Sequence, residues 1–363
     1  MRIKLEKRPR PSLFMLVATP VASVLLTMLI GLLVFDLIGI DGYRAVVDIF
    51  LTPVLADYKR QDVLVKAAPL IIIALGLAVG NRAQVWNIGA EGQYVVGALC
   101  ATGVGIAVGA AGGPLVMLAM VLAGMIGGAL WGGIPAFLRT RFNVNEILTS
   151  LMLTYVALQM LGYLVGGPWK DPDGRNFPAT APLADNQTLP ILVGGTTIHL
   201  GILLALLLPF VFWLLMSRSV FGFQIRVVGS APNAARHGGF DAKRTIWLAL
   251  LISGAMAGLA GALEFAGVMK KMELGFPSGY GFTAIIVAFL GRLHPIGCLI
   301  AGLVLAITSV GGQVAQTTVH IPNATAGIFQ AMMLFFILAS DIFIRYRVRL
   351  IPAAKALKTV AGE

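Results

Sequence analysis

Long apolar runs separated by short polar segments dominate this chain. Most of the runs approach the ~20 residues that an α-helix needs to cross the hydrocarbon core of a bilayer. Ten runs can be marked, at residues 13–35, 63–80, 88–110, 114–138, 145–167, 196–216, 245–268, 280–290, 296–312 and 324–344. The run at 280–290 is too short to cross alone, so we expect a tilted or half-membrane helix there. The pattern predicts an all-α polytopic membrane protein with about ten transmembrane helices, one of them short or re-entrant.

The composition excludes an ordinary water-soluble domain. Hydrophobic residues make up 58% of the 363 residues and charged residues only 12%, whereas soluble domains carry about 25% charged residues. So few charges cannot coat a water-exposed surface, and a bilayer is the solvent that remains. Cys100 and Cys298 both lie within apolar runs, where we expect small buried hydrophobes rather than a disulfide or a metal site.

Lysine and arginine are distributed unevenly between the two sides of the membrane. Cytoplasmic loops retain these residues, whereas translocated loops are poor in them. If the N-terminus lies inside, 19 of the 27 fall in inner segments and seven in outer segments, with Lys66 at the start of a helix. Ten spans then place both basic ends of the chain in the cytoplasm. The net charge of +11 is interpreted as this topology signal plus attraction to anionic membrane lipid. Nucleic-acid binding is not expected, because the basic residues are scattered over loops and tails.

Sequence motifs for nucleotide hydrolysis, metal binding and acyl transfer are missing. No Gly-x-x-x-x-Gly-Lys-Ser/Thr loop, His-Glu-x-x-His sequence or Gly-x-Ser-x-Gly sequence occurs. The four histidines lie far apart in the sequence and in predicted depth. We therefore expect no catalytic residues, no metal site and no cofactor bound by this chain.

Polar side chains at membrane depth are costly, which makes them the first candidates for function. Glu91 and Glu146 fall in the first turns of the third and fifth spans, where the positive end of the helix dipole favours a carboxylate. Structural acids that pack between helices and acids that take part in substrate passage are both open interpretations. The tentative substrate path consists of Asn87, Glu91, Gln93, Tyr94, Asn145, Glu146, Thr149 and Tyr155. The uncharged members of this list offer hydrogen bonds without fixed charge, which suits a neutral polyhydroxylated or heterocyclic solute.

Glycine pairs at helical spacing predict close packing of helices. The Gly-x-x-x-Gly pattern puts two glycines on one helix face and lets two backbones approach. It occurs at Gly105/Gly109, Gly128/Gly132 and Gly254/Gly258. The pattern indicates a tightly packed bundle and carries no information about a substrate.

The longest inner loop, residues 217–244, is expected to form two short amphipathic helices. Ser230 or Asn233 can cap the second of these, and Gly238 and Gly239 can stop it by allowing a left-handed residue. A rigid short helix under the bilayer would fit a groove on a cytoplasmic partner. An ordered linker without a partner is the alternative.

Three segments together resemble a known family. They are Gly229-x-x-x-Asn233-Ala-Ala-x-x-Gly238, the run from Trp86 to Gln93, and the run from Asn145 to Ser150. These segments are similar to those of the permease subunits of bacterial ABC importers of the branched-chain amino acid and ribose type. Within that group the chain most resembles permeases of nucleoside or simple-sugar importers that work with a lipoprotein of the basic membrane protein family.

The resemblance implies both an organisation and a set of partners. The domain order would be a basic cytoplasmic segment 1–12, one permease domain 13–344 and a basic cytoplasmic tail 345–363. Within the permease domain, loop 217–244 would be cytoplasmic and loops 36–62 and 168–195 external. The residues implied to dock on the ATPase are Gly229, Asn233, Ala234, Ala235 and Gly238.

The implied partners are ABC ATPase subunits that use ATP and Mg, a second permease subunit, identical or different, and an external binding lipoprotein. The implied location is the bacterial inner membrane.

A secondary transporter driven by an ion gradient is the alternative function. Five plus five spans permit an inverted repeat, and Glu91, Glu146 and Glu264 could carry protons. The sequence shows no convincing internal similarity between the two halves. A membrane enzyme is a third class, but the acids and potential ligands do not concentrate near one interface.

Overall fold

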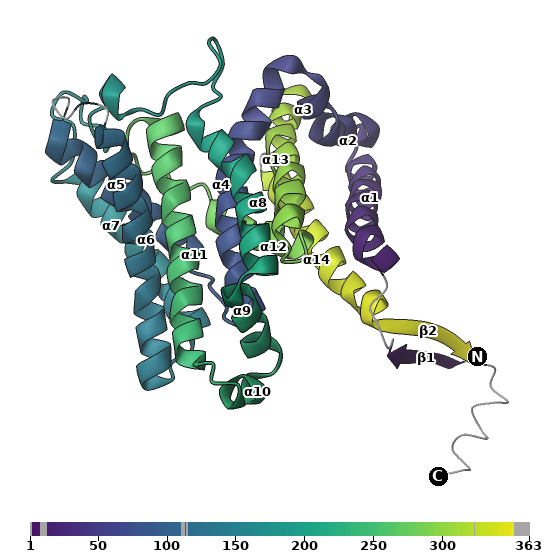
Figure 1. The fold of residues 1–363 in the computed structure, drawn as a ribbon. Coiled ribbons are helices and arrows are strands. Elements are labelled where there is room, and N and C mark those ends of the chain that lie inside the picture. The colour runs from purple at the N-terminus through teal and green to yellow at the C-terminus, as the bar shows by residue number, and fades with distance from the viewer. Residues whose placement is uncertain (1, 8–12, 110–112, 114, 323, 352–363) are drawn as a thin grey trace.

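The apolar runs form helices close to where the sequence predicts them. The computed structural model describes residues 2–7, 13–109, 113, 115–322 and 324–351, and Figure 1 shows their arrangement. Within these ranges, eight helices are long and apolar enough to cross a membrane, and two shorter apolar helical stretches cover Tyr280–Leu290 and Gly327–Ser340. The prediction of an all-α polytopic membrane protein is confirmed, including the short helix at 280–290.

The α-helices, in chain order, are α1 (Leu13–Leu37), α2 (Gly42–Phe50), α3 (Thr52–Leu55), α4 (Asp57–Arg82), α5 (Ala90–Val108), α6 (Leu115–Phe142), α7 (Glu146–Gly166), α8 (Leu200–Arg218), α9 (Val220–Ser230), α10 (Pro232–His237), α11 (Ala242–Glu264), α12 (Tyr280–Leu290), α13 (Pro295–Thr318) and α14 (Ala324–Arg345). A 3-10 turn, η2 (Asp185–Gln187), lies in the long loop before α8, and a π-helical turn, η3 (Phe265–Met269), extends α11. Two strands, β1 (Arg2–Lys7) and β2 (Tyr346–Ile351), pair in antiparallel register.

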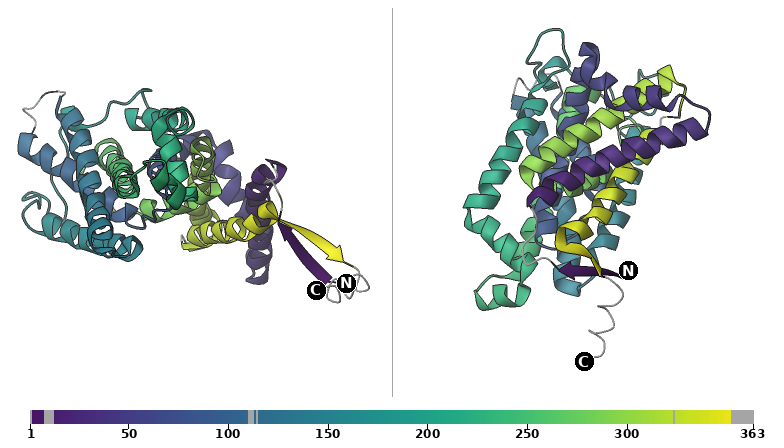
Figure 2. Two further views of the ribbon diagram at one scale, coloured as in Figure 1. Left: turned by 60° about the horizontal axis from the view of Figure 1, so that its bottom comes forward. Right: turned by 90° about the vertical axis from the view of Figure 1, so that its right-hand side faces the viewer.

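The most buried helices are α4, α5 and α11, whereas α1 and α7 are mostly exposed within the chain. Helices α6 and α7 pack on one side of this centre, and α13, α14 and α1 lie on the other. The pair β1–β2 and helix α10 lie at one end of the bundle, and α2 and α3 lie at the opposite end (Figures 1 and 2). Both ends of the described chain therefore lie on the same side as the 217–244 loop.

Two of the three glycine pairs form a helix crossing. An ideal Cβ on Gly128 would lie 2.3 Å from the carbonyl oxygen of Gly254, and one on Gly258 would lie 2.2 Å from that of Gly124. The backbones of α6 and α11 thus touch through glycines, as the spacing predicts. The Gly105/Gly109 pair differs, because Gly109 has a positive φ of 61° and ends α5.

Two local expectations were wrong. Helix α4 begins at Asp57, so Lys66 lies inside the helix rather than at its start. The predicted loop 36–62 contains α2 and α3, and Asp41 caps α2 by accepting a hydrogen bond from the Arg44 amide.

The predicted cap of α10, Ser230 or Asn233, is the second expectation that was wrong. Ala231 is its N-cap, with no side-chain hydrogen bond, and Pro232 opens the helix, since proline needs no N–H there. Ser230 instead ends α9. The stop is confirmed at Gly239, which has a φ of 79°.

Candidate functional site

A polar cluster lies where the segment after α4 enters α5. The side-chain amide of Asn87 donates to Gln93 Oε1 at 2.7 Å and to Ser253 Oγ at 2.8 Å, and its Oδ1 accepts from Gln93 Nε2 at 3.2 Å. All three side chains are buried. The same Oδ1 accepts from the Gly89 amide at 3.1 Å, which fixes the turn into α5. The cluster therefore ties α5 to α11 with uncharged groups only.

Glu91 caps another helix. Its carboxylate accepts hydrogen bonds from the amides of Gly279 at 2.9 Å and Gly281 at 2.6 Å. These amides belong to the first turn of α12, whose N–H groups have no partner within the helix. An ideal Cβ on Gly281 would lie 2.2 Å from the Glu91 amide nitrogen, so the starts of α5 and α12 are in direct contact. The negative carboxylate is stabilised at this position because the N-terminal end of α12 carries the positive end of the helix dipole.

Aromatic rings pack beside this junction. Tyr94 stacks on Phe276 with ring centroids 5.0 Å apart and meets the edge of Tyr280 at 6.0 Å. Tyr94 and Phe276 are almost fully buried. The Tyr94 hydroxyl has no hydrogen-bond partner within the described part of the chain. Three aromatic rings thus pack together beside the starts of α5 and α12.

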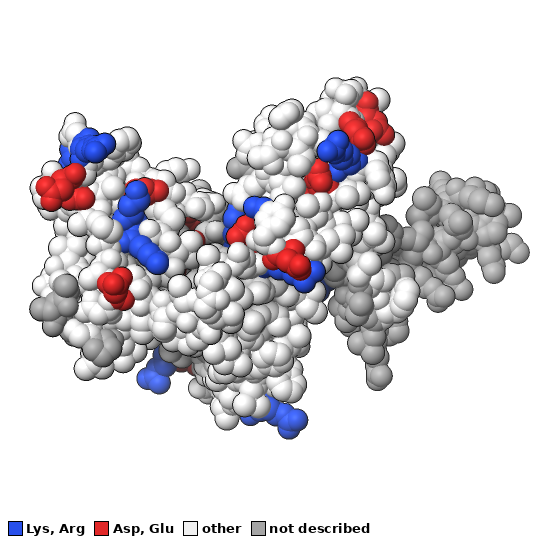
Figure 3. All heavy atoms as spheres, turned by 90° about the horizontal axis from the view of Figure 1, so that it is seen from above, with Lys and Arg blue, Asp and Glu red and all other residues white. Residues whose placement is uncertain are grey.

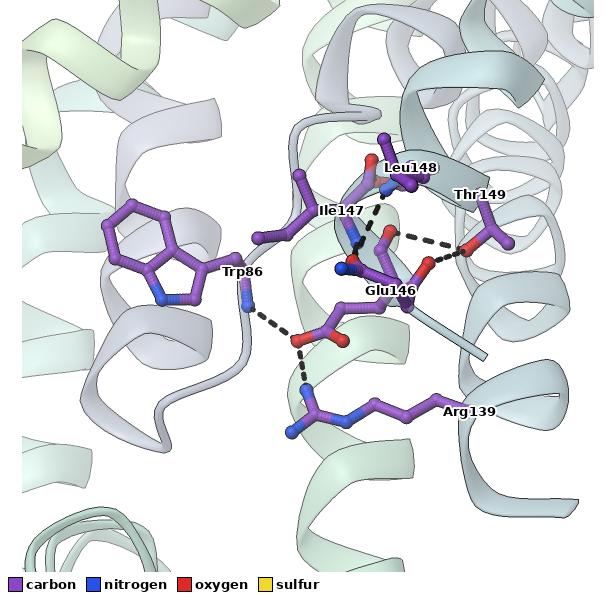
Figure 4. Close-up of polar contacts among 8 residues, drawn as sticks. Trp86, Arg139, Glu146, Ile147, Leu148 and Thr149 are labelled. Carbon is purple, nitrogen blue, oxygen red and sulfur yellow. Dashed lines mark hydrogen bonds and ion pairs between the residues drawn. The ribbon is translucent and has the colours of Figure 1, made fainter. Parts of the chain in front are cut away.

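The start of α7 forms a second polar group (Figure 4). Asn145 caps α7 by accepting from the amides of Ile147 and Leu148, and the Thr149 hydroxyl donates back to the Asn145 carbonyl. Glu146 is buried; it pairs with Arg139 of α6 and accepts a long hydrogen bond of 3.4 Å from the Trp86 amide. Glu146 thereby joins α6, α7 and the segment before α5.

The structure brings most of the predicted path residues into two neighbouring groups, but not all of them. Asn87, Glu91, Gln93 and Tyr94 lie together, and Glu146 contacts the same segment through Trp86. Asn145 is exposed, Thr149 is half-buried, and the Tyr155 side chain is 58% exposed on the outer face of α7. Tyr155 therefore does not join the buried cluster within this chain.

Several residues of the site were not singled out from the sequence. Some partners lie more than 160 residues away in the sequence. They are Ser253, which bonds Asn87, and Gly279 and Gly281, which bond Glu91. Phe289 of α12, on which the Trp86 ring stacks with centroids 5.6 Å apart, was not singled out either. No local signal marks these pairs, because they form only when α11 and α12 fold against α5.

The helices α9 and α10 project from the bundle at its lower end in Figure 1. An ideal Cβ on Gly229 would lie 2.0 Å from the carbonyl oxygen of Arg82, the last residue of α4, so α9 packs directly on that end. Ala235 is buried and anchors α10, whereas Asn233, Ala234 and Gly238 are exposed. A partner could therefore contact α10 and displace α4 through α9.

Within the described residues, no group of three or more His, Cys, Asp or Glu side chains is placed to hold a metal ion. Cys298 is buried and Cys100 is half-buried, and both thiols are free. The burial agrees with their interpretation as small hydrophobes.

Replacing Glu91 by glutamine is expected to destabilise the junction of α5 and α12. Glutamine keeps one acceptor oxygen but turns an NH₂ group toward a backbone N–H, which costs about 1–3 kcal/mol in a buried site. The apparent Tm of the purified protein should fall, whereas Glu273→Gln, at a surface ion pair with Lys271, should change stability by less than about 1 kcal/mol. An unchanged Tm together with lost transport would instead indicate that Glu91 acts in substrate passage rather than in packing.

Comparison with known proteins finds one family model and several relatives that match this sequence. Residues 60–338 match the family model described as branched-chain amino acid transport system / permease component. The glucose ABC transporter permease protein TsgB13 of Haloferax volcanii is 36% identical over 360 residues, which cover 96% of this chain and 94% of that protein. The guanosine ABC transporter permease protein NupP of Bacillus subtilis is 31% identical over 336 residues, covering 90% of this chain and 94% of that protein.

The nucleoside ABC transporter permease protein NupB of Lactococcus lactis is 26% identical over 351 residues, which cover 94% of this chain and 95% of that protein. No solved structure gives a significant match.

Proposed function

Because the chain belongs to the branched-chain amino acid transport system permease family, we propose that it conducts a nucleoside or a simple sugar through the plasma membrane as half of an ABC importer. The relatives differ in cargo by name, since one is a glucose permease and two others are guanosine or nucleoside permeases. The buried polar side chains of Asn87, Gln93 and Ser253 are uncharged, which supports a neutral rather than a charged cargo.

The observation that carries the proposal is the contact between α9 and the end of α4. ATP hydrolysis takes place in a separate ATPase subunit, which uses ATP and Mg²⁺. We assign the coupling to Gly229, Asn233, Ala234, Ala235 and Gly238 within loop 217–244. Asn233, Ala234 and Gly238 are exposed and would contact the ATPase, whereas Gly229 and the buried Ala235 hold α9 and α10 in place. Movement of α10 would pass through α9 to Arg82, and from there along residues 83–89 to the Asn87 cluster. Differential contacts of the ATPase in its two nucleotide states would then alternate the access of the path.

The remaining partners are assigned to the external side of the membrane and to the exposed face of α7. External loops 36–62 and 168–195 would receive a substrate-loaded binding lipoprotein. Figure 3 shows this end of the bundle, where small groups of acidic and basic side chains stand on a mostly uncharged surface. A second permease subunit, identical or different, would complete the path, and the exposed face of α7 with Tyr155 is available to it. The basic segments 1–12 and 345–363 would be cytoplasmic; residues 1, 8–12 and 352–363 lie outside the described residues.

A matched pair of substitutions tests the docking site. Ala234 and Ala181 are both exposed alanines, but Ala234 lies on α10 and Ala181 on the external loop before α8. Ala234→Arg should abolish co-purification of the ATPase subunit and ATP-driven uptake, because the bulky cation occupies the docking surface. Ala181→Arg should retain the ATPase. Equal retention in both variants, or uptake that survives vanadate but not a protonophore, would overturn the proposal.

A further inference from the structure

A groove of about 660 Å³ opens between α1, α13 and the turn that joins α12 to α13. Its walls are apolar, with Val21 and Leu25 on α1 and Ile300 on α13, and each of these side chains is more than half exposed within the chain. In a membrane protein such side chains face lipid tails rather than water. The walls of the groove are therefore accessible from the bilayer.

One part of the groove is cationic. Arg82, Arg292 and His294 line it, and the described lining residues include no carboxylate. Arg292 also donates a hydrogen bond to the Thr19 hydroxyl of α1. The Arg82 side chain is partly buried and makes no hydrogen bond or ion pair within the described residues. A partly buried guanidinium is costly unless an anion pairs with it. Burial of His294 lowers its pKa, and the positive charge of Arg82 lowers it further. The His294 ring is therefore neutral at pH 7, so the two arginines carry the positive charge and His294 can form hydrogen bonds.

The position of the cationic part defines which lipid leaflet it meets. Arg82 ends α4 where α9 packs against it, so the cationic part lies at the cytoplasmic end if α10 faces the ATPase as proposed above. Cationic side chains at that depth meet phosphate head groups of the inner leaflet, which is rich in anionic lipid. The apolar walls would then lie against the acyl chains of the same molecule.

We propose that this groove binds one anionic phospholipid of the inner leaflet, with its phosphate on Arg82 and Arg292 and its acyl chains along α1 and α13. The apolar walls favour a lipid over free phosphate, since a free anion gains nothing from them. Because the carbonyl group of Arg82 contacts Gly229, a lipid held there also steadies the junction between α4 and α9. Transport should consequently depend on anionic lipid.

The test compares lipid binding by the assembled transporter with and without the cationic groups. Native mass spectrometry would follow phosphatidylglycerol bound to the wild-type complex, to the double variant Arg82→Gln/Arg292→Gln and to the control Arg141→Gln. Arg141 is an exposed cation in the last turn of α6, outside the groove. We expect the double variant to bind phosphatidylglycerol at least tenfold more weakly and the control to match the wild type.

Three results would overturn the proposal, and all can be obtained with wild-type protein if the double variant fails to fold. Phosphatidylcholine retained as well as phosphatidylglycerol would show a slot for any lipid. Displacement of the lipid by millimolar inorganic phosphate would show a free-anion site. Uptake in pure phosphatidylcholine vesicles equal to that with 20 mol% phosphatidylglycerol would remove the functional link. Because lipid binding is measured without transport, its failure is distinguishable from failure of the proposed import function.

Discussion

Replacing Gly258 by leucine is expected to prevent the protein from accumulating in the membrane. Gly258 lies where α11 crosses α6 and α5: its own Cβ would lie 2.2 Å from the Gly124 carbonyl oxygen, and a Cβ on Gly97 would lie 2.2 Å from the Gly258 Cα. These neighbours are backbone atoms, which cannot rotate away as a side chain can. Even Gly258→Ala should cost about 3 kcal/mol, at the upper end of ordinary overpacking. Membrane yield and apparent Tm measure both effects.

A glycine on the facing helix provides the control. Gly133 lies in α6, and an added Cβ there would meet only side-chain atoms of Trp247 and Leu251 at 3.5 Å, an ordinary contact distance. Gly133→Ala should leave yield unchanged and could raise stability by about 0.5–1 kcal/mol, because alanine loses less conformational entropy in a helix. If Gly258→Ala were as well tolerated as Gly133→Ala, direct backbone contact between α11 and α6 would be wrong.

The helices of this fold are predictable from the sequence because the bilayer imposes a length and an apolar composition on each one. The exceptions are α2, α3 and the start of α4. Helices α2 and α3 are short and residues 57–62 are polar, so hydropathy alone assigns residues 36–62 to a loop. Glycine spacing predicts that α6 and α11 pack closely, but it gave the same signal at Gly105/Gly109, where Gly109 ends a helix. A glycine that packs against a neighbouring helix can be distinguished from one that ends a helix only when the backbone of the neighbouring helix is known.

The candidate site was predictable only in its local part. Asn87 and Gln93 are six residues apart, so a shared turn brings them together. Ser253 and the first turn of α12 come from distant segments, and no pattern in those segments points to α5. Tyr155 illustrates a different limit: α7 is apolar around most of its circumference, so the sequence does not say which face is buried.

Gly229→Ala is expected to reduce ATP-driven uptake at least tenfold while leaving the transporter assembled. The added methyl group would lie 2.0 Å from the Arg82 carbonyl oxygen and 3.0 Å from its carbonyl carbon. Helix α9 must therefore move away from the end of α4, and the contact that we assign to force transmission is lost. Because α9 and α10 lie outside the bundle, the spanning helices should stay folded. Uptake into vesicles, with ATP hydrolysis measured in parallel, would show hydrolysis uncoupled from transport.

The matched control is Gly238→Ala, in the same loop and in the same resembling motif. Gly238 has an ordinary φ of −78°, and an added Cβ would meet its nearest atoms, the carbonyl oxygens of Ala234 and Ala235, at 3.5 Å. The loop itself should therefore accept alanine there; because Gly238 belongs to the proposed docking surface, uptake is expected to fall less than in Gly229→Ala. The motif alone treats the two glycines as equivalent, whereas the packing makes only Gly229 intolerant of a side chain. If both variants kept the same high uptake, the contact between α9 and α4 would not be needed for coupling. Only docking of the ATPase on α10 would then remain.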